Sequence, residues 1–258
     1  MSRQVLVVGD VQGDYERLQE ALEPYPAEDV DTVFLGDFFQ GGRPGGAGGY
    51  HAARIAMERP KSHSILGNHD LMLLAVLEKE RGGDVNWRSP GGRTLEEIWL
   101  MRRGDRTDLL AVGEDPVLEH WLRGLPLMQR LGDGTLVQHT DDDVYAAAGA
   151  TVEEVNAVAH EALASPGGVP TILQLTIGRH GFTGRERLTR YLAHFGATRV
   201  VHGHTPHWEA TPSTRHGGRV IGYDGRFSRF WGREPGEEHG PIGATVALLP
   251  PEIPAAQR

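Results

Sequence analysis

The chain has 258 residues, of which 39% are hydrophobic and 24% are charged. These fractions are typical of globular proteins and exclude a collagen-like, coiled-coil or wholly disordered chain. The 35 acidic residues outnumber the 26 lysines and arginines, and the formal charge of −9 argues against general binding to nucleic acids or anionic membranes. The absence of cysteine excludes disulfides, thiolate zinc sites and cysteine nucleophiles, whereas 13 histidines are many for this length.

No segment of the sequence predicts export or membrane insertion. Residues 1–4 run directly into a short apolar stretch at residues 5–8, without the basic region, long apolar segment and cleavage site of a secretory signal. The longest apolar stretch elsewhere, residues 71–77, is far shorter than the roughly 20 residues that span a bilayer. We expect a soluble cytoplasmic protein, and the sequence leaves its oligomeric state open.

Short apolar runs in the first part of the chain are predicted to be buried strands, at residues 5–8, 32–35 and 64–66. Between them, residues 15–22 and 50–58 have the apolar spacing of helices. Each apolar run is followed at once by glycine and polar residues. In a βαβ arrangement the carboxyl ends of parallel strands share one edge of the sheet, so we expect these polar residues to lie together.

The rest of the chain is predicted to contain further helices and strands. Helical spacing favours helices at residues 71–80, 95–101, 116–122, 152–163 and 185–195. Apolar runs predict strands at residues 127–131, 136–139, 199–202, 219–223 and 244–248. No linker divides the chain, so we predict a single domain over residues 1–249 and a flexible tail at residues 250–258. The glycine-rich residues 41–49 are predicted to form a mobile loop.

Polar side chains that suit metal binding follow the predicted strands. They are Asp10, Gln12, Asp37, Asn68, His69, His139, His202 and His204. Carboxylate and amide oxygens combined with imidazoles suit Mn, Fe or Zn rather than Ca, which prefers oxygen alone. Asp37 is central in this order, and one carboxylate can bridge two ions about 3.5–4 Å apart that share a water. Each Asp or Asn alone is equally typical of a turn, but the joint pattern predicts a hydrolytic two-metal site.

Five ordered motifs resemble those of the calcineurin-like metallophosphoesterases. They are GDVQG at residues 9–13, GDFFQGG at 36–42, GNHD at 67–70, the strand-end His139 and VHGHTP at 201–206. The resemblance extends from Val5 to about Asp224, and GNHD and GHTP in this order are its most specific part. It implies an α/β fold, a four-layer α/β/β/α sandwich in which helices flank two mixed sheets.

Within this superfamily the chain resembles two groups of enzymes. Residues 67–76 (GNHDLMLLAV) are closest to the symmetrical diadenosine tetraphosphate hydrolases. Residues 139–156 and the RHGFTG segment at residues 179–184 instead resemble the bacterial serine/threonine phosphoprotein phosphatases. We therefore place the chain in the branch that contains both groups.

The resemblance implies a role for each motif residue. Asp37 would bridge two divalent metal ions, for which manganese is the first expectation and Fe, Zn, Co and Ni are alternatives. The further ligands that it implies are Asp10 and Gln12 for the first ion, and Asn68, His139 and His204 for the second. A hydroxide between the ions would attack phosphorus in line, and His69 would protonate the leaving oxygen as the general acid.

Three positions depart from the family pattern. Gln12 replaces a metal-binding histidine and is a weaker, neutral ligand, so we expect the first ion to bind loosely. Gln40 replaces the carboxylate that orients the general acid, and Gly41 replaces an arginine that binds phosphate. We expect Arg179, in a segment that resembles the family's second phosphate-binding arginine, or Arg43 on the glycine-rich loop, to bind the substrate phosphate instead.

Two acidic features near these motifs are interpreted as structural. Asp70 is expected to cap the helix that it begins. Residues 141–143, which are three consecutive aspartates, are expected to form a solvated loop near the mouth of the site.

Three functions are compatible with these residues. The first is hydrolysis of phosphate monoesters, with phosphoserine or phosphothreonine in a protein as the expected substrate. The second is hydrolysis of diadenosine tetraphosphate or another dinucleoside polyphosphate, favoured by residues 67–76, Gln12 and Gln40. The third, a non-catalytic module that binds metal or phosphate, is motivated by the three departures. Catalysis is favoured over the third function because Asp37 and His69 both remain.

Overall fold

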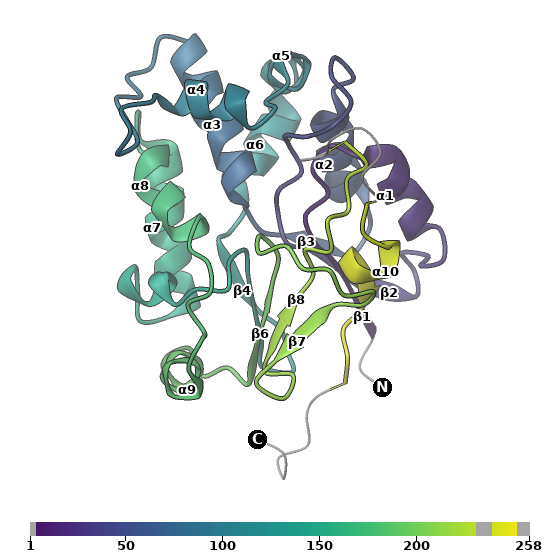
Figure 1. Ribbon diagram of the computed structural model, residues 1–258. Helices are drawn as coiled ribbons and strands as arrows, with labels where there is room; N and C mark the ends of the chain where they lie inside the picture. The colour runs from purple at the N-terminus through teal and green to yellow at the C-terminus, as the bar shows by residue number, and fades with distance from the viewer. Residues whose placement is uncertain (1–3, 231–238, 252–258) are drawn as a thin grey trace.

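Two mixed β-sheets pack against each other in the computed structural model, which describes residues 4–230 and 239–251 (Figure 1). The first sheet has the strand order β3-β2-β1-β9 and consists of β1 (Gln4–Val8), β2 (Val30–Phe34), β3 (Ser62–Ser64) and β9 (Val246–Leu248). The second has the order β4-β5-β6-β8-β7 and consists of β4 (Met128–Arg130), β5 (Thr135–Gln138), β6 (Arg199–His202), β7 (Ser213–Arg215) and β8 (Val220–Gly222). Strands β9, β4 and β7 run antiparallel to their neighbours, and the other pairs are parallel.

Helices cover the outer faces of the two sheets, so the predicted α/β/β/α fold class is confirmed (Figure 1). The α-helices are α1 (Tyr15–Leu22), α2 (Gly48–Glu58), α3 (Asn68–Glu80), α4 (Leu95–Met101), α5 (Arg106–Glu114), α6 (Pro116–Gly124), α7 (Val152–Ala164), α8 (Val169–Leu173), α9 (Arg185–His194) and α10 (Ile242–Thr245). Among residues 4–230 and 239–251, no helix combines the length and the apolar character that crossing a membrane requires.

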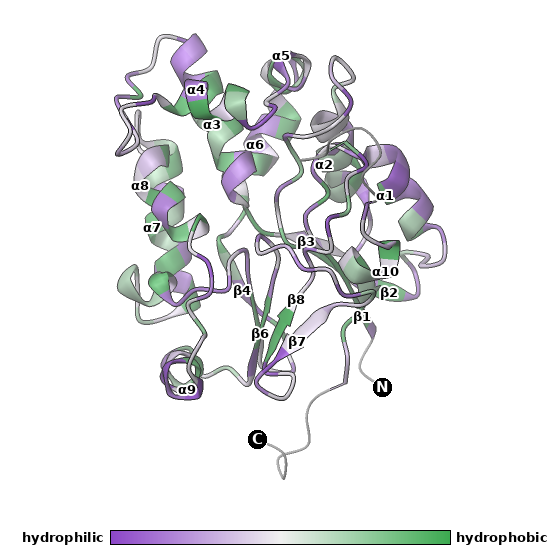
Figure 2. Ribbon diagram, in the orientation of Figure 1, coloured by the Kyte–Doolittle hydropathy of each residue, from purple (hydrophilic) through white to green (hydrophobic). Residues whose placement is uncertain are grey.

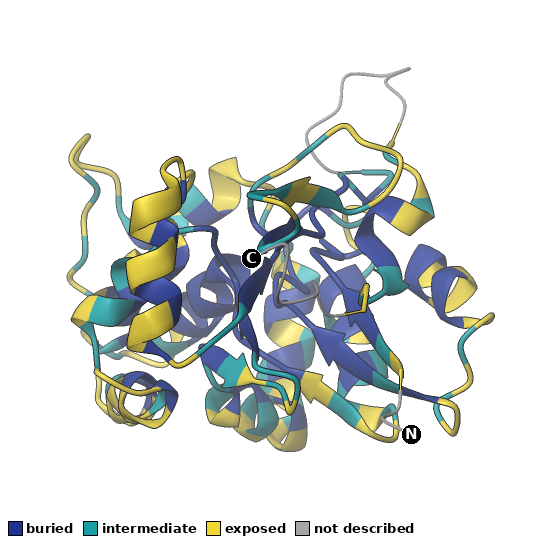
Figure 3. Ribbon diagram, turned by 90° about the horizontal axis from the view of Figure 1, so that it is seen from below, coloured by how far each residue is buried: buried dark blue, intermediate teal, exposed yellow. Residues whose placement is uncertain are grey.

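A compact apolar cluster lies between the two sheets. It joins Val7 of β1 to Val201 of β6 and Ile221 of β8, all of which are fully buried. Because side chains alternate along a strand, Leu6 and Val8 point to the opposite face and belong to the larger core beneath the helices. Both faces of these strands are therefore buried, which is why the sequence shows continuous apolar runs (Figures 2 and 3).

Helix α3 is the innermost helix and positions the start of the GNHD motif. Its residues from Asn68 to Leu77 are all buried, because α4 and α8 both pack against it. A helix that is apolar nearly all round is typical of such a central position. The packing therefore fixes the first turn of α3, which carries Asn68 and His69, against the sheet edge.

Some elements differ from the sequence predictions. The sequence pattern does not predict α5, α8 or β7, because α5 buries only one face, α8 has five residues, and β7 (STR) has no apolar side chain. The strand predicted at residues 244–248 begins only at Val246. Residues 242–245 instead form α10, where Ala244 lies against Gly225 and the hydroxyl of Thr245 accepts a hydrogen bond from the Gly225 N–H at 3.0 Å.

The glycine-rich segment at residues 41–49 is hydrogen-bonded to the start of α5, and its last two residues belong to α2. The N–H of Gly45 donates to the Asp105 carboxylate at 2.9 Å, and the N–H of Ala47 donates to the Thr107 hydroxyl at 3.1 Å. At Gly48, a Cβ atom would lie 2.1 Å from the carbonyl oxygen of Gly13, so a larger residue does not fit.

The predicted tail lies only partly within the described residues. Residues 252–258 lie outside them. The carbonyl oxygens of Pro250 and Pro251 accept hydrogen bonds from the buried Arg199 guanidinium at 2.8 and 3.3 Å. The start of the tail is therefore attached to the second sheet.

Candidate functional site

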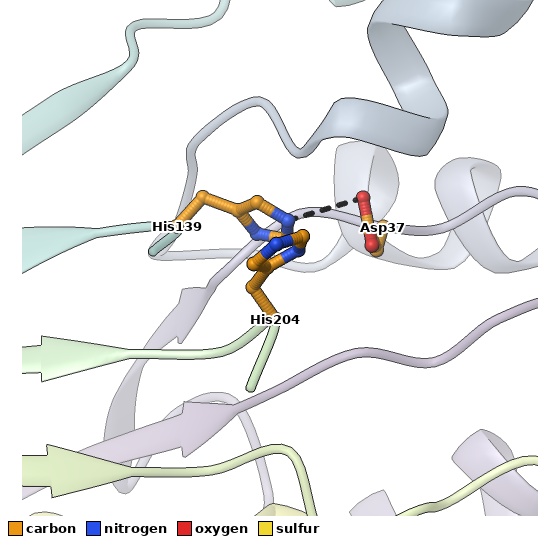
Figure 4. Close-up of side chains that lie close together, drawn as sticks. All are labelled: Asp37, His139 and His204. Carbon is orange, nitrogen blue, oxygen red and sulfur yellow. Dashed lines mark ion pairs between the residues drawn. The ribbon is translucent and has the colours of Figure 1, made fainter. Parts of the chain in front are cut away.

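Three of the predicted metal ligands meet where strands of both sheets end. One donor atom each from Asp37, His139 and His204 lies within 4.8 Å of the other two, and all three residues are buried (Figure 4). They follow β2, β5 and β6, respectively. Asp37, which follows a strand of the predicted βαβ arrangement, thus lies together with two histidines that follow strands of the second sheet.

The backbone of the site explains why its motifs are rich in glycine. A Cβ atom on Gly67 would lie 2.1 Å from a carboxylate oxygen of Asp37, and one on Gly203 would lie 2.1 Å from a carboxylate oxygen of Asp10. Left-handed backbone, which is uncommon for other residues and clusters at functional sites, occurs at Gln12, Asp37, Gln40 and His204. The motifs thus allow close approach between chain segments at the ligands.

His139 is oriented as a metal ligand would be. Its Nδ1–H donates to the carbonyl oxygen of Leu35 at 2.7 Å, so its Nε2 faces the site. That Nε2 lies 3.1 Å from the Asn68 side-chain oxygen and 3.3 Å from a carboxylate oxygen of Asp37. The Nε2 atom of His204 is buried without a hydrogen-bond partner among the described residues. Oxygen and imidazole donors that face each other in this way fit a divalent cation.

The charges within the cluster support the same fit. Burial alone would raise the pKa of Asp37, but the charges of His139 and His69 hold it well below its usual range. Burial alone would lower the pKa of His139, but the charge and hydrogen bond of Asp37, with the charge of Asp10, raise it to about 10. Burial lowers the pKa of His204, which leaves this imidazole neutral. The negative charge of Asp37 therefore stabilises a positive charge beside it.

The residues predicted to hold the first ion lie beside this cluster. The carboxylate of Asp10 accepts the N–H of His204 at 2.9 and 3.1 Å, and the N–H of Gln12 donates to the carbonyl oxygen of Asp37 at 2.9 Å. Burial, with the negative charges of Asp224 and Asp37, raises the pKa of Asp10. Three acidic groups thus lie close enough to repel each other, and bound cations would relieve this repulsion.

Asp224 is a site residue that the sequence analysis did not assign. It directly follows β8, is buried, and its pKa is raised to about 6 by burial and by the charge of Asp37. A signal was present, because Asp224 stands next to a glycine after an apolar run, as Asp10 and Asp37 do.

His69 lies next to the cluster. Its N–H donates to a carboxylate oxygen of Asp37 at 2.9 Å, and its Nε2 lies 3.6 Å from the other oxygen of that carboxylate. Its Nδ1 is hydrogen-bonded to the side-chain oxygen of Gln40. Burial lowers the pKa of His69 to about 4; the positive charges of Arg102 and Arg179 act in the same direction, and the negative charge of Asp37 opposes them.

Asp70 does more than cap its helix, which extends the sequence interpretation. Its carboxylate accepts three backbone N–H groups, those of Gly67, Asp37 and Phe38, each at 2.9 Å. Only the first of these belongs to the start of α3. Because the other two belong to the GDFFQGG motif, Asp70 fixes the backbone of Asp37 against α3.

Asp141 corrects the expectation that residues 141–143 are a solvated loop. Its side chain is fully buried and accepts the Thr205 hydroxyl at 2.7 Å and the N–H of His180 at 3.0 Å. It also pairs with Arg215 at 2.5 Å. Asp141 thus attaches the segment that carries Arg179 to the loop after His204.

The structure separates the two predicted phosphate-binding arginines. The positive charge of Arg179 contributes to the low pKa values of His69 and His204, so its guanidinium lies near the cluster. Arg43 instead lies 5.8 Å from the ring centre of Phe230, in a pocket that Gly13 and Tyr15 also line. Of the two, Arg179 therefore fits contact with a phosphate at the cluster.

This fold and this site define a class of protein, the metal-dependent phosphoesterases with a two-sheet sandwich. Residues 3–208 match the calcineurin-like phosphoesterase family, and the chain belongs to this family. The family match includes every predicted ligand from Asp10 to His204.

Curated relatives include the symmetrical bis(5'-nucleosyl)-tetraphosphatases of Ralstonia nicotianae, 31% identical over 154 residues, and of Methylococcus capsulatus, 33% identical over 144 residues. These alignments cover 57% and 52% of this chain, and 48% and 41% of the relatives. The chain thus spans less than half the length of these relatives.

Solved structures of phosphatases share the fold. The cold-active protein-tyrosine phosphatase of a Shewanella species has a TM-score of 0.63 at 18% identity, over 97% of this chain and 81% of that chain. A protein serine/threonine phosphatase from Saccharomyces cerevisiae has a TM-score of 0.52 at 13% identity, over 98% of this chain and 82% of that chain. At these identities the likeness shows the fold alone.

Proposed function

We propose that this chain is a dinuclear, metal-dependent phosphoesterase that hydrolyses phosphate monoesters. The observation that carries the proposal is the meeting of Asp37, His139 and His204 within 4.8 Å, with His69 beside them. Asp37 would be a ligand of both ions. The remaining ligands would be Asp10 and Gln12 on one side, and Asn68, His139 and His204 on the other.

Divalent ions at these residues would supply Lewis-acid activation of a water and of the phosphoryl group. The chain's own residues supply orientation and a proton. The negative charge of Asp37 raises the pKa of His69 against the effect of burial, and the negative charge of a bound phosphate would raise it further. With its Nδ1–H held by Gln40, the ring protonated in this way would donate its Nε2 proton to the leaving oxygen, which departs as an alcohol. Arg179 balances negative charge on the phosphate, because a guanidinium stays charged at any working pH.

For the substrate, we propose phosphoserine or phosphothreonine in a protein. The support is the likeness of residues 139–156 and 179–184 to phosphoprotein phosphatases, together with the attachment of the Arg179 segment to the site by Asp141. The test is release of inorganic phosphate from p-nitrophenyl phosphate and from a phosphoserine peptide with Mn²⁺. Asp37→Ala and Asn68→Ala should abolish both activities.

A second substrate, diadenosine tetraphosphate, is favoured by the likeness of the chain to the symmetrical bis(5'-nucleosyl)-tetraphosphatases. Product analysis separates the two proposals. Two molecules of ADP from each diadenosine tetraphosphate, formed faster than phosphate from the peptide, would favour the second substrate. Tight binding of metal and phosphate without turnover of either substrate would favour the non-catalytic module.

Manganese is our first proposal for the native metal, because carboxylate, amide and imidazole donors suit it. Fe, Zn, Co and Ni fit the same donors. Elemental analysis of the purified protein, with an activity screen over these ions, decides among them.

A further inference from the structure

The turn that follows α4 lies directly against Gly41, where the family resemblance expects a phosphate-binding arginine. The N–H of Gly41 is hydrogen-bonded to the carbonyl oxygen of Arg103 at 3.4 Å. Gly41 follows Gln40, which holds the ring of His69. The turn formed by residues 102–104 is therefore adjacent to the residues that surround the general acid.

This turn is held rigidly from beneath. The N–H of Arg102 donates to the carbonyl oxygen of Ile98 at 2.9 Å, and the N–H of Gly104 donates to that of Trp99 at 2.8 Å. Trp99 is fully buried, and a Cβ atom on Gly104 would lie 2.2 Å from its ring. The backbone that carries Arg102 is thus fixed in advance of any ligand, which lowers the entropic cost of binding.

The side chain of Arg102 differs from those of its neighbours. Arg103 is hydrogen-bonded to the carbonyl oxygen of Phe230, and Arg106 pairs with Glu80 and Glu96 at 2.7 and 2.9 Å. Within residues 4–230 and 239–251, no hydrogen bond or ion pair engages the guanidinium of Arg102, which belongs to an exposed residue. Its donors are therefore available to a ligand.

The charge of Arg102 reaches the site. Its positive charge acts on the ring of His69, as that of Arg179 does. Coulomb energy falls with distance, so both guanidinium groups lie near the imidazole. Two positive charges beside a general acid suit a doubly charged phosphate, which accepts two N–H groups from one guanidinium.

We propose that Arg102 replaces the arginine that Gly41 lacks and binds the substrate phosphate together with Arg179. The replacement comes from a different segment of the chain, the turn after α4, and this is why the sequence motif alone indicates a missing residue. The inference rests on the proposed function, since it assigns a further substrate-binding residue to the same site.

The test is calorimetric binding of inorganic phosphate to the Mn²⁺-loaded protein, which requires no turnover. Arg102→Ala should weaken phosphate binding by about 10- to 100-fold, the range for a lost hydrogen bond to a charged group. The phosphate affinity of Arg102→Lys should lie between those of Arg102→Ala and the wild type, because lysine keeps the charge but loses the bidentate geometry. Arg106→Ala, which removes another exposed arginine four residues away, is the control and should bind phosphate as the wild type does.

A second readout separates binding from folding. Low concentrations of guanidinium should restore p-nitrophenyl phosphate hydrolysis by Arg102→Ala, whereas equal concentrations of sodium chloride should not. Phosphate affinity of Arg102→Ala equal to that of the wild type would overturn the inference and leave the proposed function intact. A wild type that binds phosphate through Arg102 but hydrolyses no phosphoester would refute the proposed function and support the inference.

Discussion

The side-chain oxygen of Gln40 accepts a hydrogen bond from Nδ1 of His69, within a site where both residues are buried. An amide oxygen only accepts, so the proton resides on Nδ1 and Nε2 is directed to the site. Gln40 thus orients the ring of His69, as the carboxylate that it replaces would, but adds no charge.

Removal of the hydrogen bond between Gln40 and His69 should impair catalysis most for substrates with poor leaving groups. Gln40→Ala should lower kcat for phenyl phosphate by about 10- to 100-fold, because a general acid contributes at least that much when the leaving oxygen is basic. The loss for p-nitrophenyl phosphate, whose leaving oxygen needs little protonation, should be about threefold or less. Steady-state kinetics on the two substrates measure the difference. Gln40→Glu keeps an acceptor and is the control; equal losses on both substrates would contradict the positioning role.

Replacement of Gln12 by histidine should strengthen metal binding. Imidazole is a better ligand than an amide oxygen for Mn²⁺, and the left-handed backbone of Gln12 (φ 48°) is one that histidine tolerates. We expect Gln12→His to lower the Mn²⁺ concentration for half-maximal activity by about tenfold. Gln12→Ala should raise it. An identical Mn²⁺ requirement in all three proteins would show that residue 12 is not a ligand.

Loss of the Asp70 carboxylate should destabilise the fold and the site together. Asp70→Ala leaves three backbone N–H groups without their acceptor, including that of Asp37. We expect the free energy of unfolding to fall by about 3 kcal/mol, measured by urea denaturation, and Mn²⁺ to bind more weakly. The control Asp84→Ala removes an exposed carboxylate from the surface. A role limited to capping α3 would predict a loss of about 1 kcal/mol and unchanged Mn²⁺ affinity.

Stability should decline with rising pH through the titration of Asp108, a buried residue of α5. Burial raises its pKa to about 7; the charge of Asp105 adds to the rise, and hydrogen bonds from the N–H groups of Tyr50 and Gly49 oppose it. Between the ordinary value of 3.8 and about 7, the folded chain binds more protons than the unfolded chain. The free energy of unfolding therefore falls as pH rises through this window and levels off above it.

Asp108→Asn tests this dependence. The variant should show a shallower slope between pH 4 and 7, by at most about 1.4 kcal/mol per pH unit. Urea denaturation at several pH values, with Asp84→Asn as the control for loss of one exposed carboxylate, measures the slopes. Parallel pH profiles for Asp108→Asn and the wild type would refute this assignment.

The sequence predicts the sheet edge that carries the site because the signal there is local. Each parallel strand is buried on both faces, so it appears as an apolar run, and the glycine and aspartate that follow mark its end. Asp37, His139 and His204 could be grouped from this pattern. The motif resemblance then provides the roles that spacing alone leaves open.

The remaining contacts depend on tertiary packing and leave no local signal. Asp141 appears as part of an acidic run, and only the fold brings it to Thr205 and the N–H of His180. Arg102 lies at the end of a helix, some 60 residues from Gly41 in the sequence. The fold brings the two together, and the N–H of Gly41 donates to the carbonyl oxygen of the neighbouring Arg103. Asp224 had a local signal, but its closeness to Asp10, whose pKa its negative charge raises, requires the second sheet to be in place.

The most direct test of the central claim is the rate of p-nitrophenyl phosphate hydrolysis with Mn²⁺, compared between the wild type and Asp37→Asn. The wild type should be active only with a divalent ion and should lose activity with a chelator. Asp37→Asn, which removes the charge at the centre of the cluster, should lose at least about 100-fold in kcat. Full activity of Asp37→Asn, or hydrolysis unaffected by the chelator, would contradict a metal-dependent phosphoesterase centred on Asp37.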